Sequence, residues 1–340
     1  MDTLYFLIYE PSQPWIFMEF SNNFLIIVLA IVLDAILGDP KWVYSKIPHP
    51  VAVIGFQIER LDRFLNQTIY STSTRKIFGL VSVVIVISSS WLFGWLIDNL
   101  CSQLSFGIIL QVVTVSIFLA QNSLYRHVAS VAKACSANDI ISARSQISHI
   151  VGRDPNSLDQ KAIGRASIES LSENFSDGVV APIFWYAVGG LPALIAYKAL
   201  NTSDSMIGYL NEKYAHFGWC SARLDDLANF IPARLSALII SVAAFLIPSA
   251  NGSNAFKTAI RDAKKHRSKN AGWPEAAMAG ALDIKIAGPR HYSGGLVNDA
   301  WMGAGTSNVE ASHIHRALRI FCVSCVLNVF WLILLDSINF

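Results

Sequence analysis

The sequence predicts an all-α membrane protein, a polytopic helical bundle with about five to six apolar segments. Of its 340 residues, 53% are hydrophobic and only 15% are charged, whereas soluble domains carry about a quarter charged residues. The mean hydropathy is +0.43. The apolar residues gather in runs of helical pattern, and no alternation of polar and apolar residues predicts a strand.

A helix needs about 20 apolar residues to cross a bilayer. Six runs approach that length: 24–38, 77–97, 104–120, 179–199, 235–248 and 317–335. Asp34 interrupts the first run, and an ionisable group at membrane depth is a functional candidate by its position alone. Gly189, Gly190 and Pro192 break the fourth run. The sequence therefore leaves open whether some segments are re-entrant.

Basic residues set the expected orientation, because short loops rich in lysine and arginine stay in the cytoplasm. Six of them lie between the first two runs, whereas the link at 99–103 has none. The amino terminus is therefore expected outside, with 121–178 and 249–316 as polar cytoplasmic regions. Either the fourth and fifth runs both cross, or both dip into the membrane and return. The Gly-Gly break and the polar flanks favour the second arrangement.

Several common chemistries are absent from the sequence. It contains no G-x-x-x-x-G-K-[ST] phosphate loop, no H-E-x-x-H zinc motif and no G-x-S-x-G nucleophile elbow. The net charge of +2 gives no reason to expect nucleic acid as a partner. Cys322 and Cys325 form a C-x-x-C pair inside the last apolar run, where no second ligand pair accompanies them. We interpret them as packing residues.

Carboxylates concentrate just before the fourth apolar run. Glu169, Glu173 and Asp177 are spaced at i, i+4 and i+8, so a helix would stack three negative charges on one face and be destabilised. One interpretation is a solvated acidic face. The other is a site where a cation or a cationic substrate offsets the repulsion. On that second interpretation Glu173 or Glu169 acts in catalysis, and Asp177 and Asn174 bind substrate.

Oxygen ligands for a metal ion are predicted after the same run. Asn201 and Asp204 form an N-x-x-D turn. Asp225, Asp226 and Asn229 form a D-D-x-x-N turn. Mg²⁺ takes one or two carboxylates together with phosphate oxygens and water. We therefore predict that these five residues hold Mg²⁺.

Arginines are interleaved with these acids, and a guanidinium group matches phosphate or carboxylate oxygens in a bidentate way. Arg165, Arg223 and Arg234 are the candidates to neutralise a phosphoryl group as its charge develops. The alternative is simple ion pairing, for example of Arg223 with Asp225 or Asp226.

Other polar groups are weaker candidates. His49 and His291 are candidate contacts to substrate, with a purely structural role as the alternative. The basic run 257–269 is expected to face anionic lipid rather than to form a catalytic patch. The segment 288–295 is either a loop that closes over a ligand or a plain connection.

Seven stretches together are similar to one known family. They are LDAILGDP (33–40), HPVAVIG (49–55), GRD (152–154), ENFSDGVVAPIFW (173–185), NTSDSMIGY (201–209), FGWCSARLDDLANFIPAR (217–234) and NAGWPEAAMAGAL (270–282). In this order they resemble the CobD/CbiB family of cobalamin biosynthesis, the adenosylcobinamide-phosphate synthases. We therefore expect residues 1–340 to form a single integral-membrane domain, in which residues 1–22 are an extension that does not match the family.

The resemblance implies a ligase of the inner membrane whose active site faces the cytoplasm. It would join a carboxylate of adenosylcobyric acid, a corrinoid substrate, to aminopropanol or its O-phosphate. The product would be adenosylcobinamide or its phosphate. Because amide formation from a carboxylate is uphill in water, we expect ATP and Mg²⁺ to take part. Glu275, in the last matching stretch, is expected to contact substrate, and membrane lipid and other cobalamin-pathway enzymes are expected partners.

Two rival classes use similar residues. An intramembrane prenyltransferase-like enzyme also holds Mg²⁺-diphosphate with N-x-x-D and D-D-x-x-[DN] turns, although these normally lie at the ends of long spans. A membrane transporter or sensor would use the acids as an ion pathway. The small number of apolar segments and the lack of an internal repeat argue against a transporter.

Overall fold

The computed structural model describes residues 4–10, 13–20, 22–151, 154–292 and 295–338. Its regular structure is almost entirely helical, so the predicted all-α class is confirmed. Two antiparallel hairpins were not predicted. One pairs β1 (Leu4–Glu10) with β2 (Gln13–Phe20), and the other pairs β3 (Ile286–Tyr292) with β4 (Gly295–Met302).

The helices follow in chain order: α1 (Asn22–Leu37), α2 (Lys41–Tyr44), α3 (Pro50–Leu65), α4 (Thr72–Ser102), α5 (Gly107–Ile117), α6 (Gln121–Ser136), α7 (Ile140–Ile147), α8 (Gln160–Phe175), α9 (Ala181–Ile207), α10 (Trp219–Ala228), α11 (Phe230–Phe245), α12 (Gly252–Asp262), α13 (Gly272–Leu282) and α14 (Ala311–Ile338). In the described ranges, three short turns complete them: η1 (Pro155–Ser157) and η3 (Ala263–Lys265) are 3₁₀ turns, and η2 (Ser176–Val180) is a π turn that joins α8 to α9.

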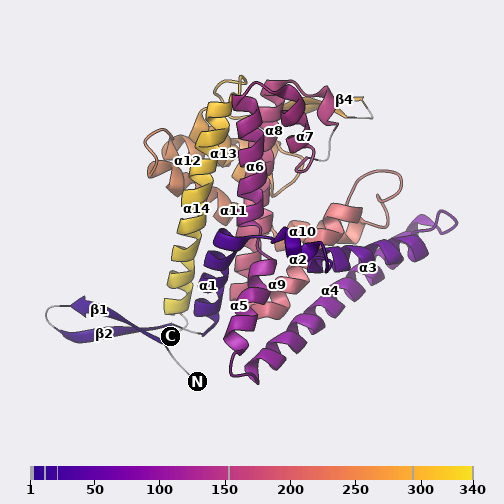
Figure 1. The fold of residues 1–340 in the computed structure, drawn as a ribbon. Coiled ribbons are helices and arrows are strands. Elements are labelled where there is room, and N and C mark those ends of the chain that lie inside the picture. Colours follow the sequence, from indigo (N-terminus) through magenta and orange to yellow (C-terminus); the bar gives the residue numbers. More distant parts are fainter. Residues whose placement is uncertain (1–3, 11–12, 21, 152–153, 293–294, 339–340) are drawn as a thin grey trace.

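Helix α8 forms the centre of the upper part of the bundle in Figure 1. From Ile163 to Ser172 only Arg165 is not fully buried, and α6, α7, α13 and α14 pack around it. At the last residue of α8, Phe175 meets Phe321 of α14 edge to face, with ring centroids 5.7 Å apart. A helix that is apolar or small on every side is stable only inside a bundle. The core of this part of the protein is therefore built on α8.

Among the described residues, four helical runs are long and apolar enough to cross a membrane: Thr72–Ser102, Gly107–Ser136, Gln160–Ile207 and Ala311–Ile333. The pair α10 and α11, bent by 46° where they meet, would make a fifth. Helix α1 is apolar but shorter. The six apolar runs of the sequence thus all fall on helices, as expected of a membrane protein.

The run that contains α9 does not continue straight. The backbone leaves the helical region at Gly189 (φ −151°, ψ 25°) and Gly190 (φ 65°, ψ −158°), and glycine alone adopts the second conformation without strain. Tyr197 follows Asp177 by 20 positions, about 30 Å along a straight helix. Its hydroxyl nevertheless lies 3.2 Å from the carbonyl oxygen of Asp177, and its ring stacks on that of Trp185. The chain therefore turns back at the Gly-Gly break, which fits the re-entrant arrangement.

Asp34 in α1 has its partner at the start of α6. Its carboxylate accepts the backbone N–H of Gln121 at 2.9 Å, and the Gln121 side chain donates to the carbonyl of Ile31. Asn122 donates to the carbonyl of Ala35 at 2.6 Å. The first N–H groups of a helix have no partner inside it, and a carboxylate there also complements the positive end of the helix dipole. Asp34 is thus a structural joint between α1 and α6.

Asp262, at the end of α12, joins three groups. Arg261 and Lys265 each approach its buried carboxylate to 2.6 Å, and the backbone N–H of Gly303 donates to it at 2.9 Å. The hydrogen bond from Arg261 holds the pKa of Asp262 well below its usual range. This carboxylate therefore attaches α12 to the residue that follows β4.

Replacing Asp262 with Asn is expected to lower the free energy of unfolding by about 2 kcal/mol at neutral pH, because a charged acceptor of several hydrogen bonds is lost. A depressed pKa stabilises the fold above the ordinary carboxyl pKa of about 4, and this stabilisation is lost as the pH falls further. Thermal unfolding in detergent between pH 7 and pH 3 should therefore show the two proteins converging at low pH. Asp283→Asn, at an exposed carboxyl group, is the matched control. A constant difference between Asp262→Asn and wild type across this range would contradict the prediction.

Candidate functional site

Acidic and amide side chains meet beside the point where the chain turns back. Asn229 donates to one carboxylate oxygen of Asp225 at 3.0 Å, and Asn201 approaches the other at 3.5 Å. The Tyr197 hydroxyl donates to the side-chain oxygen of Asn229 at 2.9 Å. Asp225 and Asn229 are themselves buried. Two segments that are far apart in sequence, the second half of α9 and the end of α10, are thus joined by side-chain amides.

Charges surround this contact. The carboxylates of Asp204 and Asp226 lie near enough to Asp225 to repel it. Asp177 lies near the same group, and the ammonium group of Lys198 attracts both Asp177 and Asp225. We call the group formed by Asp177, Lys198, Asn201, Asp204, Asp225 and Asn229 the Asp225 cluster.

Local structure explains how these residues converge. Asp177 lies in the π turn η2, a deviation from the α-helix that is frequent at functional sites. Lys198, Asn201 and Asp204 are three residues apart along the second half of α9, so they lie along one side of that helix. The turn at Gly189–Gly190 brings this side back against η2. A straight α9 would separate Asp177 from Lys198.

The Asp225 cluster fits Mg²⁺ only if other oxygen atoms complete the coordination of the ion. Within the described ranges, no three His, Cys, Asp or Glu side chains are grouped closely enough to hold a metal by themselves. The cluster does offer the carboxylates of Asp204 and Asp225 together with the amide oxygen of Asn201. Mg²⁺ characteristically keeps several waters and binds one or two carboxylates plus substrate phosphates. The residues therefore suit an ion completed by phosphate oxygens and water.

Asp226 points to a different set of partners. Its carboxylate lies 3.8 Å from Arg223 and 3.3 Å from Lys269. Its backbone carbonyl accepts from Asn270 at 2.8 Å, and Asn270 in turn lies 3.4 Å from the guanidinium group of Arg234. The ion pair considered for Arg223 is thus present. Asp226 therefore lies between the Asp225 cluster and the basic side chains of Arg223 and Lys269, and its role as a metal ligand stays a prediction.

Glu169 and Arg165 contact the β3–β4 region. Glu169 is buried and accepts the backbone N–H of Ala287, the second residue of β3, at 2.8 Å. Arg165 donates to the carbonyl of Ser307 at 2.8 Å and covers the ring of Trp301. Both side chains therefore position the hairpin on α8. Of the segment 288–295, residues 288–292 and Gly295 lie in the two strands of that hairpin, and residues 293–294 lie outside the described part of the chain.

The remaining acids of the predicted ladder separate along the helix. Glu173 is exposed and lies within electrostatic range of Asp177. Asn174 donates to the carbonyl and hydroxyl oxygens of Ser170, at 2.9 and 3.2 Å. Glu173 and Asp177 thus lie together, whereas Glu169 faces the hairpin.

Two further predicted contacts lie in different places. Glu275, buried in α13, lies 3.7 Å from the His266 ring. Arg234 covers the rings of Phe230 and Trp273, in addition to its contact with Asn270. Arg234 is therefore connected to Asp226 through Asn270, while Glu275 faces the segment after α12.

His49 begins α3, where its Nδ1 accepts the backbone N–H of Val51 at 3.2 Å. Its Nε2 lies 3.5 Å from Asp39, and Asp39 in turn acts electrostatically on Lys198. His49 therefore caps α3 and contacts Asp39, and its contact with substrate stays a prediction. His291 lies in β3, and its side chain falls outside the described part of the chain.

Comparison with known proteins gives one consistent result. Residues 27–321 match the model of the family described as CobD/Cbib protein. The chain belongs to the CobD/CbiB family. Relatives named cobalamin biosynthesis protein CobD include one from Rhizobium meliloti (strain 1021), 48% identical over 307 residues, which cover 88% of this chain and 93% of the relative.

More distant members agree with this assignment. The CobD of Brucella suis biovar 1 (strain 1330) is 44% identical over 300 residues, which cover 87% of this chain and 92% of that protein. A CobD of Rhodobacter capsulatus is 41% identical over 300 residues, with coverage of 88% and 93%. No solved structure matches this chain.

In this CobD/CbiB chain, sequence reasoning missed one member of the Asp225 cluster, Lys198, and the residue that bridges its two halves, Tyr197. Both lie near the end of the apolar run 179–199, so from the sequence alone they were interpreted as part of a membrane segment. The signal that was available is the lysine itself, since an ionisable group at membrane depth calls for a partner. Its partners, Asp177 and Asp225, become visible only when the Gly-Gly break is followed through in space.

Proposed function

We propose that this protein joins a carboxylate of adenosylcobyric acid to aminopropanol or its O-phosphate, giving adenosylcobinamide or its phosphate. Membership of the CobD/CbiB family supports a role in cobalamin biosynthesis. The observation that supports a site for Mg²⁺ and phosphate is the contact between the two ends of the α9 turn: the Tyr197 hydroxyl lies 3.2 Å from the carbonyl oxygen of Asp177 and donates to Asn229, and Asn201 approaches Asp225. The enzyme would act at the bacterial inner membrane with this site open to the cytoplasm.

The chemistry requires activation of the acid. A carboxylate oxygen attacks the terminal phosphorus of ATP, ADP leaves, and an acyl phosphate forms. The free amine then attacks the acyl carbon, the C–N bond forms, phosphate leaves with the C–O bond electrons, and the nitrogen loses a proton. The protein must therefore neutralise phosphoryl charge and present an unprotonated amine.

The residues divide between these two tasks. Asp225 and Asp204, with the amide of Asn201, would hold Mg²⁺, which would supply positive charge beside the phosphates when bound. Asn229, predicted as a further ligand, accepts from Tyr197 and would orient Asp225. Lys198 adds a cation from the protein itself, and Arg223 lies on the basic side of the cluster. Glu173, exposed next to Asp177, would bind the substrate ammonium and take its proton. Ion pairing between a carboxylate and an ammonium group places the amine before it is deprotonated.

The decisive test is an assay with purified protein in nanodiscs, labelled aminopropanol phosphate, adenosylcobyric acid, ATP and Mg²⁺, scored for the amide by mass spectrometry. Amide formation that depends on ATP, with ADP released in equal amount, supports the proposal. Absence of the amide together with prenyl transfer from a prenyl diphosphate, or with substrate flux in proteoliposomes, would replace it by one of the two rival classes.

Replacing Glu173 with Gln is expected to slow the amine step by about 10²-fold, the usual contribution of a positioned general base. The pH–rate profile should lose the limb that reports this base, and the KM for the amine should rise. Glu59→Gln, an exposed carboxylate paired with Arg63 on α3, is the matched control. A Glu173→Gln profile that keeps both the wild-type shape and the wild-type rate would remove Glu173 from this role.

A further inference from the structure

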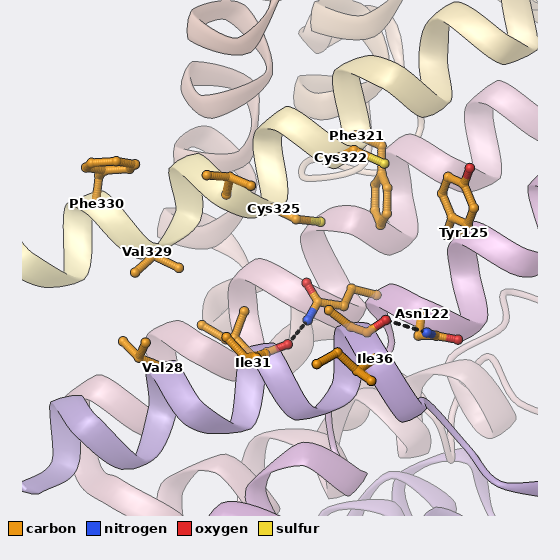
Figure 2. A pocket seen from close by; sticks show the side chains of 14 residues that line it. Val28, Ile31, Ile36, Asn122, Tyr125, Phe321, Cys322, Cys325, Val329 and Phe330 are labelled. Carbon is orange, nitrogen blue, oxygen red and sulfur yellow. Dashed lines mark hydrogen bonds between the residues drawn. The ribbon is translucent and has the colours of Figure 1, made fainter.

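An apolar groove lies between α1, α6 and α14. Figure 2 shows it from close by, with Val28 and Phe330 toward one end and Asn122 and Tyr125 at the other. Its volume is about 630 Å³. Its walls are almost wholly aliphatic and aromatic, apart from the amide and hydroxyl groups at the Tyr125 end and two cysteines. Helix α14 and the α5–α6 run are both candidate spans, so the groove opens toward the bilayer.

A second cavity, of about 960 Å³, begins where the groove ends and shares Asn122 and Tyr125 with it. It lies past the end of α1, and its walls are polar and basic. Arg126 and Lys133, seven residues apart on α6, project from one face of that helix and line it. Neither has an ion-pair partner among the residues that the structure describes.

The charges of this second cavity are unbalanced. The rings of His127 and His149 also line it, 6.3 Å apart. The only carboxylate that lines it within the described residues is Asp39, which is already 3.5 Å from His49. A third cavity of about 660 Å³ also reaches Tyr125 and adds Arg319 from α14. An anionic ligand with more than one contact point would offset the positive charges of Arg126, Lys133 and Arg319.

We propose that the groove and the basic cavity together bind one anionic phospholipid, with an acyl chain between α1 and α14 and its phosphate on Arg126 and Lys133. An acyl chain can pass from the bilayer into an apolar groove without desolvating a polar group, and basic pockets beside membrane helices recognise anionic headgroups. The two cavities follow each other in the order of an amphiphile: the apolar groove runs along α1, and the basic cavity begins after the end of α1. A nucleotide would fill only the basic part.

Asp39 lines the basic cavity and lies within electrostatic range of Lys198 of the Asp225 cluster. A phosphate bound on Arg126 and Lys133 would share this cavity with Asp39. The lipid site itself does not depend on the proposed reaction, and its test needs no corrinoid.

The test compares purified proteins in nanodiscs of phosphatidylglycerol and phosphatidylcholine, followed by release into detergent and native mass spectrometry. Wild type is expected to retain phosphatidylglycerol in preference to phosphatidylcholine. The double variant Arg126→Gln, Lys133→Gln should lose this preference by about tenfold or more, the usual effect of losing a charge-assisted contact. Val32→Trp, which fills the groove, should lose retention of either lipid. Lys161→Gln and Leu92→Trp, on exposed positions elsewhere, are the controls.

A second measurement reports on the groove without mass spectrometry. Cys322 is exposed in it, whereas Cys101, Cys135 and Cys220 are buried. Alkylation of Cys322 by a bilayer-soluble maleimide should be slower in phosphatidylglycerol nanodiscs than in phosphatidylcholine, and the head-group double variant should abolish the difference.

Equal retention of both lipids by wild type, or unchanged preference in the double variant, would overturn the proposal. So would a double variant that keeps its lipid preference but loses binding of labelled ATP or inorganic phosphate, since the basic cavity would then serve a water-soluble anion.

Discussion

Asp225→Ala is expected to reduce amide formation by about 10²–10³-fold, the usual cost of removing a group that stabilises developing charge. Asp225 is the residue on which the amides of Asn201 and Asn229 and the charge of Lys198 all converge. Removing it takes away the carboxylate that both amide side chains of the Asp225 cluster contact. It also removes the acceptor that orients Asn229 and, through it, the hydroxyl of Tyr197.

The companion variants separate charge from structure. Asp225→Asn preserves the shape of the side chain, so an equal loss of rate would assign the effect to the negative charge. Asp226→Ala should cost less, about tenfold or below, since Asp226 is occupied by Arg223 and Lys269 and ion pairs of this exposure contribute little. Initial rates at several Mg²⁺ concentrations give the readout, with thermal unfolding to confirm a folded protein. Wild-type turnover by Asp225→Ala would remove the cluster from catalysis.

Local signals in the sequence were sufficient for much of the architecture. The apolar runs predicted every candidate span, because a bilayer demands long apolar helices whatever their neighbours. The Gly-Gly-Leu-Pro break predicted the interruption of α9, since glycine adopts a positive φ and proline lacks an N–H. The approach of Asp204, Asp225 and Asn229 was also predicted from their residue types and spacing.

Long-range pairings were not predictable in the same way. Glu169 has helical spacing with Glu173, but its acceptor role toward Ala287 depends on a hairpin more than a hundred residues later. In the sequence, Asp34 is a single charge within an apolar run. Its partner is a backbone N–H of α6. Every non-proline residue carries such a group, so the sequence does not indicate which one Asp34 binds. Arg165 is a phosphate-binding residue type, yet it lies over Trp301. Residue type and spacing report on one helix face and do not indicate which element packs against it.

Lys198→Met is expected to have the second large effect, a loss of activity of about 10²-fold or more, because a cation placed among phosphoryl and carboxylate oxygens acts in a water-poor site. Methionine keeps a similar length and apolar character. The variant therefore leaves Asp177 and Asp225 in place without the ammonium group that attracts both. Lys198→Arg should retain part of the activity, and Lys161→Met, at an exposed lysine on α8, is the control.

The double variant Lys198→Met, Asp177→Asn decides what Lys198 does. If the lysine only offsets the negative charge of Asp177, removing both charges together should restore most of the lost activity, and the two effects will be strongly non-additive. If the ammonium group instead contacts the phosphate of ATP or of the acyl phosphate, the double variant should regain thermal stability but remain as inactive as Lys198→Met, with a raised KM for ATP. We expect the second result, because Asp204 and Asp225 would still present unbalanced negative charge to the incoming phosphate after Asp177 is neutralised. Recovery of wild-type kcat/KM in the double variant would limit Lys198 to a structural role.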